Sequence, residues 1–126
     1  MPLATAPNSP QEDRRVLTEA AVNTARQLGL SNAELAQVLG VSQSSTSRMR
    51  QGRYLLEPGS KSWEAALLLV RLYRSLGAIL AGDEAVIRQW LDNPNRDLGD
   101  APRDLIRTTS GLVHVVDYLD AHRAVV

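Results

Sequence analysis

The sequence contains no cysteine, which excludes disulfide bonds, thiolate metal sites and a cysteine nucleophile. It has only two histidines, His114 and His122, so we expect neither a dedicated metal cluster nor a bound cofactor. Phenylalanine is also absent, whereas alanine, leucine and valine dominate the apolar residues. This composition favours helices over strands, and a length of 126 residues suits one small domain or two subdomains that share a core.

Long uninterrupted apolar runs are lacking as well. The longest apolar stretch covers residues 63–80, is interrupted by Glu64, Arg71 and Arg74, and is shorter than a comfortable membrane span. The first residues, MPLATAPNSPQ, have neither the basic region nor the apolar core of a signal peptide. We therefore expect a cytoplasmic protein without membrane contact, in which the 63–80 helix is buried in the core or at an interface.

A net charge of zero conceals an uneven distribution along the chain. Residues 26–61 hold five basic and two acidic side chains, whereas residues 83–126 hold five arginines and eight acidic side chains. A basic middle and an acidic end suggest two different partners, although two ordinary solvated surfaces would produce the same pattern.

The chain divides into four expected segments. Residues 1–12 are rich in Pro, Ala, Ser and Asn and are predicted to be a disordered tail. Apolar residues at helical spacing follow, and they begin a helix-turn-helix region that spans residues 13–59. Residues 60–82 are expected to form a central helix that serves the core and contact with a second copy, and residues 83–126 are expected to form a C-terminal subdomain.

The stretch LSNAELAQVLGVSQSSTSRMRQG predicts two short helices joined by a tight turn. Ser31 and Glu34 form a capping box that begins the first helix. Gly40 supplies the turn, and Ser42 caps a second, polar and basic helix over residues 43–50. This pattern is typical of a helix-turn-helix that places its second helix in the major groove of DNA, although a hairpin used only for packing or protein contacts would share it. The side chains expected to contact bases or phosphates are Gln43, Ser44, Ser45, Thr46, Arg48, Arg50 and Arg53.

An ordered series of residues follows the central helix. A Trp-Leu pair ends one helix, a Pro-Asn element and a Leu-Gly turn come next, and a proline precedes a short helix. A threonine and a glycine then precede a last helix with spaced valines and leucines. The residues of this series are Trp90, Leu91, Pro94, Asn95, Leu98, Gly99, Pro102, Leu105, Ile106, Thr108, Gly111, Val115 or Val116, and Leu119.

This series resembles the C-terminal half of the Xre/MbcA/ParS antitoxins, and the upstream helix-turn-helix resembles the Xre-like half of the same architecture. The resemblance covers residues 14–126. It implies an all-α fold in which an N-terminal helix-turn-helix subdomain packs on a C-terminal helical toxin-binding subdomain.

The same series of residues could instead form a structural loop between core helices, without any toxin contact. Gly99 relaxes a turn, and Thr108 or Ser110 can cap a last helix that is expected from Gly111 to Ala121. The side chains that this helix is expected to bury are Leu112, Val115, Val116 and Leu119.

Antitoxins of this family neutralise RES-domain toxins, which consume NAD or transfer its ADP-ribose, by laying the C-terminal region across the entrance of the active site. The resemblance therefore implies a RES-domain toxin as one partner and operator DNA, bound by a homodimer, as the other. Asp100 stands where family members commonly have a second glycine, and a glycine expected near Arg123 or Ala124 is missing. The residues expected to contact the toxin are Asn93, Pro94, Asn95, Gly99, His114, Tyr118, His122, Arg123, Ala124, Val125 and Val126.

We therefore predict an antitoxin of a type II toxin–antitoxin pair that blocks an NAD-consuming toxin and represses its own operon. An enzymatic role is not expected, because the sequence offers no nucleophile with a nearby base and no phosphate-binding glycine loop. One alternative is a stand-alone helix-turn-helix repressor whose C-terminal region only dimerises. Another is an interaction protein that has lost DNA binding.

Overall fold

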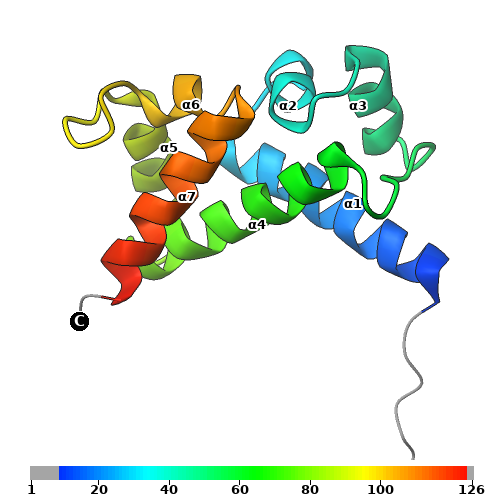
Figure 1. The fold of residues 1–126 in the computed structure, drawn as a ribbon, viewed down its shortest axis with the longest axis horizontal. Helices are drawn as coiled ribbons and strands as arrows, with labels where there is room; N and C mark the ends of the chain where they lie inside the picture. Colours follow the sequence, from blue (N-terminus) through cyan, green and yellow to red (C-terminus); the bar gives the residue numbers. More distant parts are fainter. Residues whose placement is uncertain (1–8, 125–126) are drawn as a thin grey trace, which may run out of the picture.

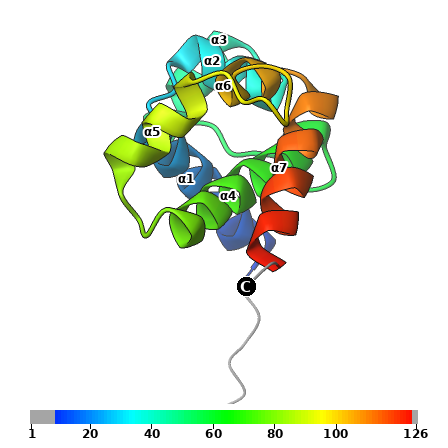
Figure 2. The ribbon, with the colours of Figure 1, turned by 90° about the vertical axis from the view of Figure 1, so that its left-hand side faces the viewer.

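The computed structural model describes residues 9–124, which form seven helices and no strand. The two longest helices, α1 and α4, cross one another, and α7 packs against α4 (Figure 1). Helices α2, α3 and α6 lie together on one side of this crossing in both views (Figures 1 and 2). The predicted all-α fold is confirmed. The helices are α1 (Pro10–Leu28), α2 (Asn32–Leu39), α3 (Gln43–Arg50), α4 (Lys61–Ile79), α5 (Glu84–Asp92), α6 (Pro102–Leu105) and α7 (Thr109–Ala124).

Helix α1 begins earlier than predicted. The Ser9 hydroxyl accepts a hydrogen bond from the Glu12 backbone N–H at 3.1 Å, and Pro10 occupies the start of the helix, where an N–H would have no partner. Residues 10–12 are therefore helical, and the prediction that a disordered tail extends to residue 12 was wrong. Residues 1–8 of that predicted tail lie outside the described residues.

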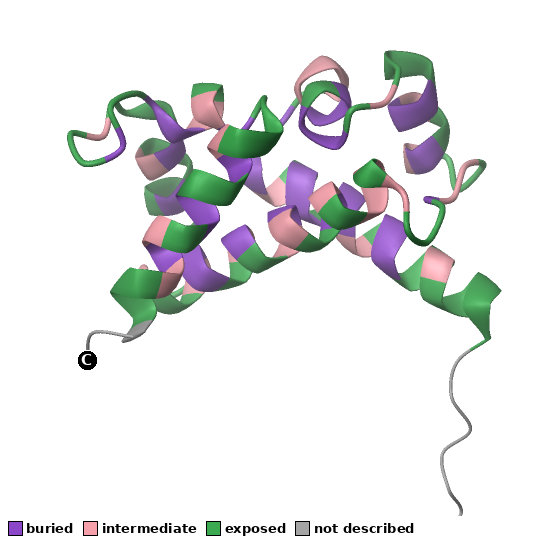
Figure 3. Ribbon diagram, viewed as in Figure 1, coloured by how far each residue is buried: buried purple, intermediate pink, exposed green. Residues whose placement is uncertain are grey.

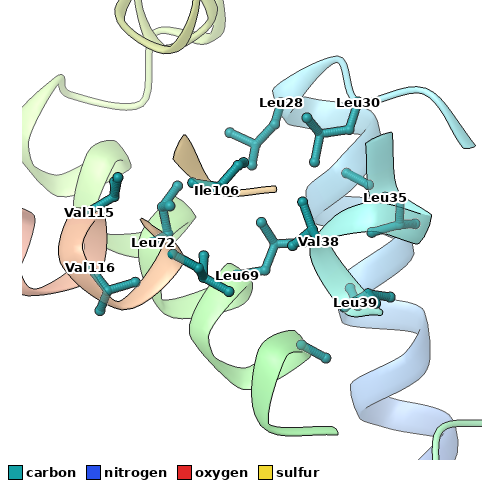
Figure 4. Close-up of a cluster of buried hydrophobic side chains, with 14 of the residues drawn as sticks. Leu28, Leu30, Leu35, Val38, Leu39, Leu69, Leu72, Ile106, Val115 and Val116 are labelled. Atoms are coloured by element: carbon teal, nitrogen blue, oxygen red, sulfur yellow. The ribbon is translucent and has the colours of Figure 1, made fainter. Parts of the chain in front are cut away.

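One apolar core connects the two halves of the chain (Figures 3 and 4). The apolar face of α2 is buried, with Leu35 and Leu39 at most 1% exposed. Ile106, which follows α6, is fully buried in the same cluster as Leu28 of α1 and Leu72 of α4. Because residues of both halves belong to this one cluster, neither half of the chain has a separate core. Burial of side chains this size contributes about 1.5–3 kcal/mol each.

Helix α4 buries one of its faces completely and others only in part. Leu69, Leu72 and Leu76 are at most 1% exposed, whereas Leu67 is 45% exposed. None of the described helices alone has the length and apolar composition to span a membrane. Helices α4 and α5 reach these limits only as a pair, and they are bent by 116° at their junction.

Helix α7 begins at Thr109, and Thr108 rather than Ser110 provides its cap. The Thr108 hydroxyl accepts a hydrogen bond from the Gly111 backbone N–H at 3.1 Å. A Cβ atom at Gly111 would lie only 1.9 Å from the Leu105 carbonyl oxygen, so the close approach of α6 and α7 requires glycine here. The predicted inner face of the helix is confirmed, because four side chains are at most 2% exposed: Leu112, Val115, Val116 and Leu119.

Candidate DNA-binding and protein-binding sites

Helix α3 presents a polar stripe to solvent. Its cap is the Ser42 hydroxyl, which accepts a hydrogen bond from the Ser45 backbone N–H at 3.1 Å. Gln43, Ser44 and Arg48 are exposed, as expected for side chains that meet DNA. Helical spacing adds two residues to this stripe that we did not predict, the partly exposed Ser47 and the exposed Gln51. The spacing i, i+4, i+8 from Gln43 could have identified both.

Two of the predicted DNA contacts face the interior instead. Thr46 is fully buried, and its hydroxyl lies 3.1 Å from the Asn32 carbonyl oxygen and 2.9 Å from that of Gln43. Ser45 is 8% exposed, and its hydroxyl lies 2.9 Å from that of Ser42. Both residues fall on the face of α3 that carries the buried Met49. The prediction that Ser45 and Thr46 contact DNA was therefore wrong, because both side chains are buried: Thr46 binds α2, and Ser45 contacts the cap of α3.

The three predicted arginines differ in their surroundings. Arg48 is exposed, and its guanidinium carbon lies 5.6 Å from the centre of the Tyr54 ring, within the range of a cation–π contact. Arg53 is exposed in the turn after α3. Arg50 is half-buried and donates hydrogen bonds to the Asn32 side chain and to the Leu30 carbonyl oxygen. Arg50 thus braces the start of α2, whereas Arg48 belongs to the polar stripe and Arg53 is exposed to solvent beyond the helix.

Two arginines from the C-terminal half bind the end of α1. Arg88 of α5 donates to the carbonyl oxygens of residues 26 and 27, each at 3.0 Å. Arg103 of α6 donates to those of residues 28 and 29, at 3.1 and 3.3 Å. The last carbonyls of a helix lack internal partners and carry partial negative charge. Neither arginine was predicted from the sequence, yet both attach the C-terminal half directly to the helix that precedes the helix-turn-helix.

Glu34 connects the start of α2 to the same C-terminal arginines. It completes the predicted capping box by accepting the Ser31 backbone N–H at 3.0 Å, and it pairs with Arg103 at 3.2 Å and Arg107 at 3.5 Å. Burial alone would raise the pKa of the Glu34 carboxyl, but the hydrogen bonds from Ser31 and Arg103 outweigh burial and lower it. The carboxylate therefore stays ionised while it links the two halves.

Side-chain hydrogen bonds close the loop after α5 and attach it to α7. The Asn95 side chain accepts the backbone N–H groups of Asp97 and Leu98, at 2.9 and 3.1 Å. Gly99 closes the turn with a φ of 90°, a value that favours glycine. The Tyr118 hydroxyl donates to the Asp97 carboxylate at 2.8 Å. Residues predicted to contact a toxin are thus brought together from two segments.

Helix α7 carries the other predicted toxin contacts along one side. His114, Tyr118 and His122 follow one another at intervals of four residues, and both histidines are exposed. The rings of Tyr118 and His122 lie 4.2 Å apart, and His122 Nδ1 is 2.9 Å from the Tyr118 carbonyl oxygen. Burial and the Asp97 carboxylate raise the pKa of the Tyr118 hydroxyl, so it remains a hydrogen-bond donor at neutral pH.

The remaining predicted contacts are placed as follows. Asn93 and Pro94 are exposed at the start of the loop. Arg123 donates to the Ser75 hydroxyl at 3.3 Å, so this side chain also braces α7 on α4. Ala124 ends α7, and Val125 and Val126 lie outside the described residues. Across residues 9–124, no group of three or more His, Cys, Asp or Glu side chains could hold a metal ion.

Comparison with known families divides the chain into the same two functional halves. Residues 9–71 match the family model of the antitoxin Xre-like helix-turn-helix domain. Residues 75–124 match that of the antitoxin Xre/MbcA/ParS C-terminal toxin-binding domain. No curated protein matches the chain. The two matched ranges meet within α4, so this helix contributes to both.

Proposed function

Because this chain belongs to the Xre-like antitoxins that carry an Xre/MbcA/ParS C-terminal toxin-binding domain, we propose that it blocks the active site of an NAD-consuming RES-domain toxin. The C-terminal loop and α7 would cover the active-site entrance. Helix α3 of a cytoplasmic homodimer would bind operator DNA and repress the operon. We propose no catalytic role for the chain itself.

The observation that carries the toxin half of this proposal is the bond between Tyr118 and Asp97. It joins two predicted contact segments that lie 21 residues apart in the sequence. This hydrogen bond attaches the Asn93–Gly99 loop to the helix that carries the exposed His114 and His122, which supports one shared contact surface. A surface that needs no ordering on association loses less entropy when it binds, which suits tight inhibition of a toxin.

Co-expression with the product of the adjacent reading frame tests the toxin half. We expect the two proteins to purify as one complex, and we expect the partner alone to deplete NAD in a timed assay. Addition of this chain should stop that depletion. If no complex forms and NAD loss continues, the chain acts as a stand-alone repressor whose C-terminal half serves dimerisation.

The DNA half predicts that Arg48→Ala weakens operator binding by roughly 1–3 kcal/mol if the side chain reads a guanine. Arg48 is exposed at the outer side of α3, so its loss removes a contact without opening the core. Gel shifts with promoter DNA at several salt concentrations provide the measurement, and affinity should fall steeply with salt because phosphate contacts release counterions.

A matched control for this measurement is Arg15→Ala, which removes the same charge from the exposed side of α1. Arg15 pairs only with Glu12 and Glu19 of its own helix among the described residues, so DNA affinity should not change. Equal losses in the two variants, or binding that ignores salt, would contradict direct contact by α3.

A further inference from the structure

A groove of about 560 Å³ lies where the N-terminal half of α1 passes the outer face of α4. Val16 of α1 and Leu67 and Val70 of α4 contribute apolar side chains to it. Val16 is 49% exposed and Leu67 is 45% exposed. These are the two most exposed large apolar side chains among residues 9–124, and both line the same groove. The groove therefore gathers exposed apolar side chains of two helices at one place.

The outward apolar face has its origin in the sequence of α4. Leu67 and Val70 lie on the opposite side of the helix from the buried Leu69, Leu72 and Leu76. A helix with one apolar stripe would suffice for the core of the chain. Val70 is partly buried against the core of its own chain, so the exposed part of this face is centred on Leu67, next to Val16 of α1 in the groove.

Charged side chains of opposite sign line the two walls of the groove. Asp13 belongs to the α1 wall, and Arg74 belongs to the α4 wall. Within residues 9–124, neither side chain forms an ion pair, although Arg71 beside them pairs with Asp120. The groove thus holds an acid and a base that do not satisfy each other. A surface of this kind is complementary in charge to its own copy turned through a half rotation.

We propose that this groove is the interface between two copies of the chain, related by a two-fold axis. Such an interface is isologous. When one residue of the first copy contacts a second residue of the other copy, the same two residues also meet with the copies exchanged. The Val16 side of one copy would pack on Leu67 and Val70 of the other, and Asp13 would pair with Arg74 across the axis twice. This inference deepens the proposed homodimer by naming its contact surface.

The location of the groove suits a DNA-binding dimer, because a second copy bound in the groove leaves α3 uncovered. A different flank of α1, which includes Val22 and Arg26, faces Met49 and Arg50 of α3. The exposed stripe of α3 is therefore not part of the proposed interface. The groove reaches α7 only at Arg123, so His114 also stays outside it.

The test exchanges the charges of Asp13 and Arg74, first singly and then together. Light scattering on the chain alone, across a concentration series, measures the molar mass of each variant. The wild type should have twice the monomer mass of 13.8 kDa. Asp13→Arg and Arg74→Asp should each weaken dimerisation about tenfold or more, since each places like charges together. The double variant should recover the dimer, because only an interface in which these two residues meet is repaired by their exchange.

An apolar pair of variants checks the same surface independently. Leu67→Lys should yield a monomer that keeps its helical content, because the Leu67 side chain is already 45% exposed. Val86→Lys alters a 40% exposed side chain on α5 away from the groove and should leave the dimer intact. A monomeric wild type, or a dimer that both Leu67→Lys and the single charge reversals leave unchanged, would overturn the proposed interface.

Toxin inhibition separates this inference from the proposed function. A wild type that is monomeric yet stops NAD depletion refutes the interface and retains the antitoxin. A dimer that fails to inhibit the partner retains the interface and refutes the antitoxin. If Leu67→Lys keeps the dimer but no longer forms the toxin complex, the groove is a toxin contact and the proposed interface is wrong.

Discussion

Deletion of residues 122–126 is expected to abolish inhibition of the toxin while leaving the fold and the DNA affinity intact. The deletion removes His122, whose ring packs against Tyr118 at the end of the proposed contact surface. It also removes Arg123, which makes one hydrogen bond to Ser75 and lies where the α1–α4 groove meets α7. Leu119 remains, and at 2% exposed it keeps α7 anchored in the core. The measurement is NAD concentration over time with the partner and equal amounts of full-length or shortened chain.

A matched control changes the same helix outside the contact surface. Val113 is 39% exposed on α7, on a different side from the stripe that contains His114 and His122. Val113→Ser should therefore inhibit the toxin as the wild type does. Thermal melting and gel shifts should be the same for both variants and the wild type. A shortened chain that inhibits fully would show that the toxin is blocked by another part of the surface.

Local patterns in the sequence were sufficient to predict the helix-turn-helix. The capping box of Ser31 and Glu34 predicted the start of α2, and the structure contains both of its hydrogen bonds. Gly40 has a φ of 70° in the turn. Each of these signals acts within a few residues, where one side chain meets the nearest backbone groups, so spacing alone identifies them.

The orientation of α3 was harder to predict because its inner face is polar. Thr46 and Ser45 resemble DNA-contacting residues in type, yet they satisfy buried hydrogen bonds to α2 and to the cap. Thr46 lies three residues before Met49 and Ser45 lies four residues before it. At this spacing they share the face of the helix that carries Met49, which is buried. The identity of a polar side chain does not decide its direction, whereas the helical period does.

The arginines that join the halves could not be predicted from local sequence. Arg103 and the Leu28 carbonyl oxygen that it binds are 75 residues apart, and Arg103 looks like any solvated residue in a short polar helix. The contact exists because the Arg103 side chain of α6 reaches the end of α1, where unpaired carbonyls attract a cation. Only the tertiary arrangement creates such a site. The start of α1 at Pro10, in contrast, had a local signal in Ser9 that the sequence analysis overlooked.

Gly111→Ala is expected to destabilise the protein by about 3 kcal/mol, although alanine is the better helix former by about 1 kcal/mol. Gly111 lies in the first turn of α7, so helix propensity alone predicts a gain. The added Cβ would stand 1.9 Å from the Leu105 carbonyl oxygen and 2.9 Å from the Thr108 hydroxyl oxygen. The first distance is a backbone contact that no side-chain rotation relieves, so α6 and α7 must separate.

Gly77→Ala is the matched control, because it makes the same exchange inside α4, where no atom outside the surrounding helix backbone and chain neighbours lies within 4 Å of the new Cβ. It should stabilise the protein by about 0.5–1 kcal/mol. Urea denaturation of both variants gives the two free energies of unfolding. Opposite signs are expected, and a Gly111→Ala protein as stable as Gly77→Ala would mean that α6 and α7 do not approach as closely as the structure has them.

The same substitution connects the packing of α7 to its proposed function. Movement of α7 away from α6 would separate Tyr118 from Asp97, and these two residues join the Asn93–Gly99 loop to the helix. The Gly111→Ala protein should therefore inhibit the toxin less than the wild type does. The comparison is made under conditions in which urea denaturation shows both proteins to be native. Operator binding should change less, because α3 packs against α1 and α2 rather than against α7. The close approach at one glycine thus positions the surface that meets the toxin.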